Sequence, residues 1–194
     1  MFAERLSSKL AGIFELSGLQ VELLAAHYEV LTRWNRALNL TSVRSLEDAV
    51  ERHYCESVFA ACHLPEGKAS VADVGSGAGF PGIPIAIVRP DISVVLIESH
   101  QRKATFLKEA SRQLANVRVV GRRAEDIAES FDWVVSRAVR YSDIARALKR
   151  LGRNAELLTG EVREADLVGF EWQQTIRLPW GERRYLWIGH NPSA

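Results

Sequence analysis

A run of closely spaced glycines with an acid on either side is the part of this chain best suited to bind a small ligand. Gly75, Gly77 and Gly79 follow an apolar, strand-like run, and Asp73 lies at the end of that run. Because glycine has no Cβ, the backbone can turn sharply and a ligand can approach its N–H groups closely. Glu98 ends the next apolar run, about twenty residues on, where an acid can accept hydrogen bonds from ribose hydroxyls. These residues predict a nucleoside-binding turn between two strands.

The same residues bear on which nucleoside is bound. The segment 77–82 fits the pattern G-x-G-x-x-G, which together with Glu98 is typical of a dinucleotide site. Asp73 favours S-adenosylmethionine instead, since a strand-end carboxylate can bind the cationic amine of its methionine part, and NAD has no such amine. The N–H groups of the helix that starts near Pro81 favour a negative group. The plainer alternative is a tight turn capped by the Asp73 carboxylate.

The whole chain limits the class of protein. Its 194 residues, 47% of them hydrophobic, fit one globular domain or one domain with an appendage. A formal charge of +1 excludes a uniformly basic nucleic-acid coat. Cys55 and Cys62 lack metal-ligand spacing and are too few for a disulfide framework, so we expect two reduced thiols and no metal site. No apolar run reaches membrane-spanning length and the start has no signal-peptide layout, so we expect a cytoplasmic protein.

Hydrophobic periodicity predicts the elements that position the glycine-rich turn. Residues from about 4 to 64 read as helices, the third over 46–62 with Ser45 as N-cap. Strands are expected at 70–74, 94–98, 117–120, 131–135, 155–158, 170–178 and 184–190, with helices at 102–114 and 141–151. Alternating strands and helices that end in a hairpin predict an α/β fold, a doubly wound, mostly parallel sheet with an antiparallel edge. The turn, Glu98 and Arg137 would then meet at the carboxyl ends of the strands.

Several short motifs resemble the RsmG (GidB) family of 16S rRNA guanine-N7 methyltransferases, within the class I S-adenosylmethionine-dependent methyltransferases. The matching pieces are Trp34-Asn35, Asn39-Leu40-Thr41, Arg52-His53, the loop 73–84, the segment 85–90, Arg123-Ala124-Glu125 and Ser136-Arg137-Ala138. They cover residues 25 to 140 in the right order. One departure is that the family usually has Lys-Gly after the fifth strand, whereas this chain has Thr159-Gly160.

The resemblance implies a fold, a cofactor and a substrate. The fold is a Rossmann-like class I methyltransferase sheet over 66–194, with an N-terminal helical extension over 1–65. The cofactor is S-adenosylmethionine, bound at Gly75, Phe80, Ala124, Glu125 and Arg137, with Asp73, Gly77, Gly79 and Glu98 in the same pocket by the class I pattern. The substrate is the guanosine at position 527 of 16S rRNA in the small ribosomal subunit. Substrate-side candidates are Asn39, Thr41, Arg52, His53 and Arg137.

The chemistry of guanine N7 agrees with the residues present. N7 carries an in-plane lone pair and no proton, so its methylation needs no general base, and we assign no catalytic residue. Exocyclic-amine methyltransferases usually place Asn/Asp-Pro-Pro-aromatic after the fourth strand, where this chain has the segment 136–139. Cytosine-C5 methyltransferases need a nucleophilic cysteine near the site, but both cysteines of this chain lie in the helical extension. Ring-nitrogen or oxygen methylation remains, and only the resemblance selects N7.

RNA contact is expected from basic residues near the mouth of the pocket. The candidates are Arg140, Arg146, Lys149, Arg150 and Arg153. Their alternative role is a solvated helix face, which is common for charge runs. Arg33, Arg36, Arg44 and Arg52 offer a second basic surface on the helical extension. Trp34 and Trp133 are expected in the core, and His53 alone would read as a surface or core histidine. We expect a monomer that binds no membrane.

Three other functions stay open on the sequence. The first is a class I methyltransferase that acts on another RNA, a protein or a small molecule. The second is an NAD-dependent oxidoreductase, which needs a proton-relay residue, and Tyr141 and Lys149 lack a convincing spacing for that role. The third is a non-catalytic relative that binds S-adenosylmethionine or RNA, which Thr159 keeps open.

Overall fold

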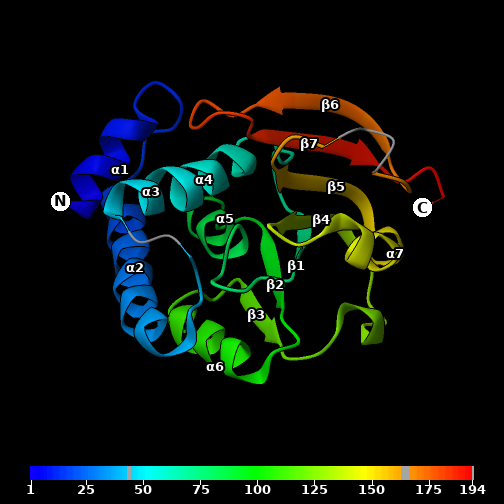
Figure 1. The fold of residues 1–194 in the computed structure, drawn as a ribbon, viewed down its shortest axis with the longest axis horizontal. Coiled ribbons are helices and arrows are strands. Elements are labelled where there is room, and N and C mark those ends of the chain that lie inside the picture. The colour runs from blue at the N-terminus through cyan, green and yellow to red at the C-terminus, as the bar shows by residue number, and fades with distance from the viewer. Residues whose placement is uncertain (43–44, 163–166, 194) are drawn as a thin grey trace.

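The computed structural model describes residues 1–42, 45–162 and 167–193 (Figure 1). The helices are α1 (Phe2–Leu10), α2 (Gly18–Leu38), α3 (Leu46–Ala49), the π-helix η1 (Val50–Cys55), α4 (Glu56–Ala61), α5 (Gly82–Val88), α6 (Gln101–Ala110), the 3₁₀ turn η2 (Ala124–Asp126) and α7 (Tyr141–Leu151). The strands are β1 (Ser70–Val74), β2 (Ser93–Ile97), β3 (Val117–Val120), β4 (Phe131–Arg137), β5 (Gly152–Thr159), β6 (Glu171–Arg177) and β7 (Tyr185–His190).

The strands form one 7-stranded sheet in the order β3-β2-β1-β4-β5-β7-β6. The pairs β1·β2, β1·β4, β2·β3 and β4·β5 are parallel, and β7 is antiparallel to both β5 and β6. The predicted α/β class, with a mostly parallel sheet and an antiparallel C-terminal hairpin, is confirmed. Since the strand order reverses between β1 and β4, a ligand site is expected above their carboxyl ends.

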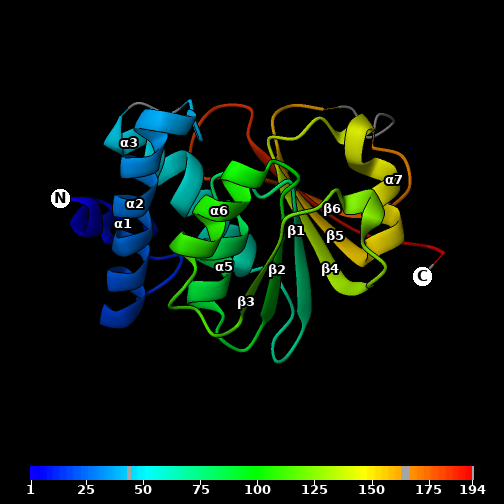
Figure 2. The same ribbon diagram turned by 90° about the horizontal axis from the view of Figure 1, so that it is seen from below.

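Helices cover both faces of the sheet because alternate strand residues point to opposite faces. Val71 and Leu96 pack with α4, α5 and α6 on one face, whereas Ala72 and Val134 pack with α7 on the other. Figure 2 shows this arrangement, with α7 and the short turn η2 on one side of the sheet and α2 outside α5 and α6 on the other. The parallel strands are therefore buried on both faces, which accounts for their nearly continuous apolar sequences.

The N-terminal helices are built onto the sheet's own core. Leu6, Leu24 and Tyr54 belong to the same buried cluster as residues of β1, β2 and α5. Trp34 packs against that cluster, as does Trp133, so both tryptophans lie in the core as expected. The division into an extension over 1–65 and a domain over 66–194 stays a prediction.

The expected single helix over 46–62 is wrong in its middle turn. Ser45 caps its start, accepting a hydrogen bond from the Asp48 N–H as expected. The turn that follows is a π-helix, and the N–H of Glu56 donates to the carbonyl of Glu51, five residues back. Hydrophobic spacing did not reveal this turn. One inserted residue shifts which side chains face the sheet, but the residue types remain those of an ordinary helix.

No described helix is long and apolar enough to cross a membrane. The helix α2 has 21 residues, but Glu22, Glu29, Arg33 and Arg36 interrupt it. Both cysteines are free thiols as expected, with Cys55 buried and Cys62 exposed.

Candidate functional site

A cavity of about 410 Å³ lies at the carboxyl ends of β1, β2 and β4, where the strand order reverses. This volume is within the range of small-molecule sites. Nine of the lining residues come from the glycine-rich turn and the strand ends: Gly75, Ser76, Gly77, Ala78, Phe80, Glu98, Arg137, Ala138 and Val139. The others are Leu40, Thr41, Ser42, His53 and Lys103. The structure therefore brings together the predicted residues Gly75, Gly77, Phe80, Glu98, Arg137, Thr41 and His53.

Two glycines shape the floor of this cavity in different ways. At Gly75, with φ +75°, a Cβ would lie 2.7 Å from the Cγ2 atom of Val139, so only glycine fits. At Gly77, with φ +53°, the nearest atom to a Cβ would be the Gly75 carbonyl oxygen at 3.7 Å. A side chain at Gly77 would therefore enter the cavity without striking a neighbouring side chain.

Glu98 holds the turn and faces the cavity at the same time. Its carboxylate accepts the N–H of Gly77 at 3.0 Å and the N–H of His100 at 2.8 Å, one on each oxygen. Each carboxylate oxygen can accept a further hydrogen bond. Glu98 is buried apart from this opening, so it can offer lone pairs to ligand hydroxyls.

Asp73 lies behind the turn rather than in the cavity. It is fully buried, its Oδ2 accepts the Gly82 N–H at 3.0 Å, and its Oδ1 has no partner. Burial raises the pKa of Asp73 to about 7. The expectation that its carboxylate points into the turn is wrong, because this carboxylate caps the start of α5. The N–H at that helix start is thereby used within the protein, and not open to a ligand's negative group as the sequence suggested.

His53 forms one wall with its ring stacked on Phe80, the ring centroids 4.6 Å apart. Its Nε2 is hydrogen-bonded to the Thr41 hydroxyl at 2.7 Å, and its Nδ1 is buried without a partner. Burial, and then the nearby Arg137 charge, lower the pKa of His53 to about 3. His53 is thus a neutral, flat surface at physiological pH.

Arg137 is held by residues that the sequence analysis missed. Its Nε donates to Glu56 Oε2 at 3.2 Å, and its Nη2 donates to the Arg52 carbonyl. Arg184, the residue just before β7, donates to both oxygens of Glu56, at 2.9 and 2.7 Å. Glu56 has no exposed surface, so one buried carboxylate fixes two guanidinium groups. In the sequence, Glu56 lies among apolar residues of a predicted helix, which could have indicated a buried carboxylate.

A buried histidine clamps the turn from the helical extension. Tyr54 OH donates to His27 Nδ1 at 2.9 Å, and His27 Nε2 donates to the Ala78 carbonyl at 3.2 Å. Burial lowers the pKa of His27 to about 4, so the ring is neutral and this donor–acceptor order is satisfied. The sequence analysis missed both residues, although His27 lies among apolar residues at helical spacing.

Some predicted site residues do not line the cavity. Gly79 faces inward, where a Cβ would lie 2.6 Å from Ile83 Cδ1. Ala124 and Glu125 form η2 outside the lining. Asn39 is exposed and ends α2 in the left-handed conformation, with φ 48°.

The predicted basic series is divided between the two ends of the sheet. Arg140 precedes α7 at the carboxyl end of β4, where it lines a smaller cavity of about 190 Å³ with Arg137 and Thr159. Arg153 is the second residue of β5, at the amino end of that strand, and Lys149 and Arg150 precede it in the last turn of α7. The expectation that all of these surround the pocket mouth is wrong, because α7 runs back along the sheet before β5 begins.

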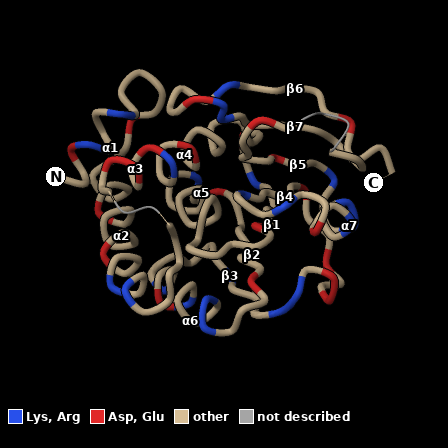
Figure 3. The backbone as a smooth tube through the Cα atoms, in the orientation of Figure 1, with Lys and Arg blue, Asp and Glu red and all other residues tan. Residues whose placement is uncertain are grey.

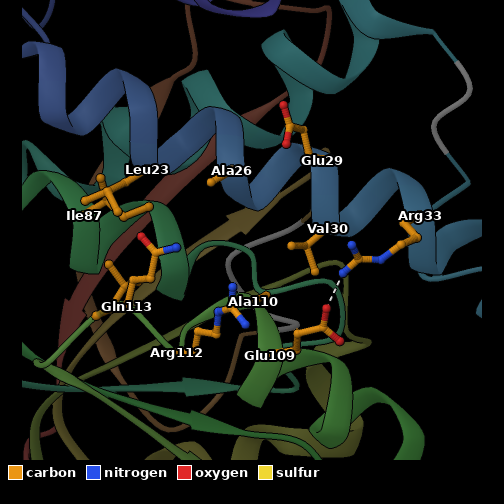
Figure 4. A pocket seen from close by; sticks show the side chains of 11 residues that line it. Leu23, Ala26, Glu29, Val30, Arg33, Ile87, Glu109, Ala110, Arg112 and Gln113 are labelled. Carbon is orange, nitrogen blue, oxygen red and sulfur yellow. Dashed lines mark hydrogen bonds and ion pairs between the residues drawn. The ribbon is translucent and has the colours of Figure 1, made fainter.

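The second basic surface carries less free charge than its sequence suggests. Arg33 forms an ion pair with Glu109 across a groove of about 330 Å³ between α2 and α6 (Figure 4). Arg52 pairs with Asp48. Arg36 is exposed, and Arg44 lies outside the described residues.

The residues of the main cavity fit a nucleoside cofactor with an amino-acid part. Glu98 has spare lone pairs for ribose hydroxyls, and Gly77 leaves open space at the turn. Arg137 offers a positive group for a carboxylate. Asp73 does not fit a direct contact in this geometry, because it is fully buried and outside the lining of the cavity.

Comparison with known proteins identifies the family. A family model described as GidB, rRNA small subunit methyltransferase G, matches residues 20–168, which is most of the chain. The chain belongs to the GidB family. It is 44% identical over 132 residues to the ribosomal RNA small subunit methyltransferase G of Methylobacillus flagellatus, covering 66% of this chain and 62% of the relative. It is 41% identical over 139 residues to that of Chromobacterium violaceum, covering 70% and 65%. The match thus spans less than two thirds of the length of these GidB relatives.

Solved structures show the same fold. Magnesium protoporphyrin IX methyltransferase from Synechocystis, with bound S-adenosylmethionine, superimposes with a TM-score of 0.64 at 15% identity, over 86% of this chain and 97% of that one. Ribosomal protein L11 methylase from Lactobacillus delbrueckii gives 0.58 at 14% identity, over 70% and 76%. The family resemblance and the Rossmann-like class I methyltransferase fold predicted from the sequence are therefore confirmed.

Proposed function

We propose that this chain uses S-adenosylmethionine to methylate N7 of a guanosine, position 527 of 16S rRNA, in the small ribosomal subunit. The observation that carries the proposal is the cavity at the strand switch, with Glu98, Gly77 and Arg137 in its wall, in a chain of the GidB family. S-adenosylmethionine, when bound, supplies an electrophilic methyl group on its sulfonium. We propose that Gly75, Gly77, Phe80, Glu98 and Arg137 hold it; contacts from Gly79, Ala124 and Glu125 remain predictions.

The chain's own residues would act by binding and orienting rather than by proton transfer. Guanine N7 has no proton to remove, so the reaction requires alignment and close approach. His53 and Thr41 are already hydrogen-bonded to each other, and His53 stays neutral because its pKa is about 3. A neutral ring beside the cavity offers a planar contact for a base without adding a charge that repels the sulfonium. Asn39 and Arg52 remain substrate-side candidates on the helical extension.

The remaining parts of the proposal concern partners and place. We propose 16S rRNA or the assembling small subunit as the partner, and Arg140 as an RNA contact beside the pocket. We expect a monomer in the cytoplasm that binds no metal and no membrane. The helices over 1–65 would form the extension and residues 66–194 the S-adenosylmethionine-binding domain.

The test is a labelling experiment. The purified chain is incubated with methyl-labelled S-adenosylmethionine and small subunits from cells that lack the modification, and the RNA is digested to nucleosides. We expect label in 7-methylguanosine at one position. Label in another nucleoside, or none in RNA while the cofactor still binds, would contradict the proposal.

The variant Gly77→Val tests whether the cofactor binds in this cavity. Since no side chain lies near the Gly77 Cβ position, valine would fill cavity space, and at φ +53° it would also strain the turn that holds the cofactor. We expect at least a ten-fold loss of S-adenosylmethionine affinity and of labelling. An affinity equal to that of the wild-type chain would show that the cofactor does not bind in this cavity.

A further inference from the structure

A second hollow lies at the amino ends of the strands, away from the cavity described above. It has a volume of about 520 Å³, and Arg146, Lys149, Arg150 and Arg153 line it with Asn191 and uncharged residues. No acidic residue is among its described lining residues. Figure 3 shows the basic residues of α7 across the sheet from the helical extension. We call this feature the basic hollow.

The basic hollow and the cofactor cavity are at opposite ends of β4. The hollow lies beside Gly152, which pairs with Phe131 at the start of β4, whereas Arg137 ends that strand in the cofactor cavity. The strand β4 has 7 residues, so the two sites are roughly 20 Å apart along it. A single nucleotide cannot occupy both.

The cations of the basic hollow are not needed to cap α7. A helix leaves its last carbonyls without partners, and cations in the last turn often satisfy them. Here the Asn191 side-chain amide donates to the Lys149 carbonyl at 2.7 Å and to the Gly152 carbonyl at 3.2 Å. The Gly152 N–H donates to the Leu148 carbonyl. The carbonyls of Leu148 and Lys149 in the last turn of α7 are therefore satisfied without charged side chains.

Among the residues that the structure describes, one of the four cations, Arg150, has a hydrogen-bonding role within the fold. Arg150 donates to the carbonyls of Ala124 and Ile127 and so holds η2 against α7. Arg146, Lys149 and Arg153 form no ion pair with any residue of the described ranges.

Asp132, the acid whose pKa Arg153 affects, is held mainly by other partners. Arg153 lowers the pKa of Asp132, but the larger causes are the Asp132 hydrogen bonds from Ser70, at 2.6 Å from the hydroxyl and 2.9 Å from the N–H. Arg146, Lys149 and Arg153 thus remain available to a ligand with several negative charges.

We propose that the basic hollow binds the phosphodiester backbone of the RNA substrate, at a point roughly 20 Å from the nucleotide that enters the cofactor cavity. This inference rests on the proposed function, because it takes RNA as the substrate. Exposed lysine and arginine bind phosphates through charge and without reading sequence. The basic hollow therefore selects a long or structured RNA over a short one and orients it along the α7 face of the sheet.

The test compares RNA lengths. Binding to small-subunit rRNA and to a short RNA of about two nucleotides, too short to reach from the cofactor cavity to the basic hollow, is measured against salt for the full chain and for R146Q/K149Q/R153Q. Each lost phosphate contact lowers the slope of log K against log salt by about 0.7 to 0.9. We expect the slope for rRNA to fall by about 2 and its affinity by at least ten-fold. Binding of the short RNA should not change.

The matched control is R102Q/K108Q/R112Q, which removes the same number of exposed charges from α6 and the residues just after it. Lys103 is kept because it lines the cofactor cavity. We expect a slope loss below half of that in the first variant. Equal losses would mean that only net charge matters and would overturn the proposal. Equal loss for short and long RNA would also overturn it.

Two further measurements separate the possible causes of a result. Titration with inorganic phosphate should not displace rRNA at millimolar concentration; displacement by free phosphate alone would overturn a site for the RNA backbone. Thermal melting of both variants shows whether they fold, and R146K/K149R/R153K should restore the slope. If rRNA binding changes as expected but no label enters 7-methylguanosine, the proposed function fails while the basic hollow stands as an RNA-binding site.

Discussion

Two regions of the molecule each bury a glutamate completely, and they treat it in opposite ways. Glu56, in α4 beside the cofactor cavity, has 0% exposure and accepts hydrogen bonds from two arginines. Glu156, in the middle of β5, has 1% exposure, and neither of its carboxylate oxygens has a partner. Its neighbours across the sheet are Val135 and Ile188.

The difference teaches that burial of an acid is not by itself a sign of function. A carboxylate that accepts hydrogen bonds from guanidinium groups positions them, as Glu56 does for Arg137. A carboxyl group in apolar surroundings stays protonated, since removing a charge from water is costly. Burial raises the pKa of Glu156 well above its ordinary value, so it is a neutral core residue that lowers stability when ionised.

The largest expected effect comes from E56Q. Removing the charge leaves the guanidinium groups of Arg137 and Arg184 without their anion, and breaking such a buried pair costs about 3 to 5 kcal/mol. Because the Arg184 side chain is 26% exposed, we expect the lower end of this range. Urea denaturation measures the loss in free energy of unfolding.

The control for this prediction is E47Q, which removes an exposed partner of Arg5. We expect it to change the free energy of unfolding by less than about 0.5 kcal/mol. Similar losses in E47Q and E56Q would break the contrast between a buried and a surface acid.

A smaller effect is expected from R184M. This variant leaves Glu56 paired with Arg137 and removes only the more exposed cation, so we expect a loss of about 1 to 2 kcal/mol. A double-mutant cycle with E56Q measures the coupling between the two residues. Additive losses would show that Arg184 does not act through Glu56, against the geometry.

The smallest effect, opposite in sign, is expected from E156L. Leucine removes the unpartnered carboxyl group, and we expect a gain of about 1 kcal/mol at pH 5. The folded-state pKa of Glu156 is raised, so its contribution to stability is complete below the unfolded value of about 4.3 and is lost as pH rises through the folded value. The gain in E156L should therefore grow between pH 5 and pH 8.

The variant E156Q sharpens this test. It cannot ionise, so it should remove the same pH dependence while keeping an unpartnered polar group and gaining less stability than E156L. A stability difference between wild type and E156Q that stays constant from pH 5 to pH 8 would show that Glu156 does not titrate as its burial predicts.

Most of the fold could be predicted because its signal is local. Apolar runs and helical spacing placed every strand of the sheet, and helix α7 was predicted at its observed bounds. The start of β5 was missed, since Arg153 and Asn154 are polar residues at the end of the sheet, where side chains reach solvent.

The site could be predicted where its residues form a local motif, or where the family resemblance marked them, as it did Thr41, His53 and Arg137. The glycine-rich turn and Glu98 form such a motif, and the cavity includes them. The bonds from Glu56 to Arg137 and Arg184 join residues 81 and 128 positions apart, which no local pattern encodes.

The π-helical turn η1 determines in which directions the side chains of the following helix, α4, point. Each residue advances a helix by about 100°, so one extra residue in the turn rotates α4 by that angle relative to α3. With this offset, His53 faces Phe80 while Glu56 faces Arg137. The π-helical turn thus fixes the angle between α3 and α4. It lets one continuous helical segment place His53 against Phe80 and Glu56 against Arg137.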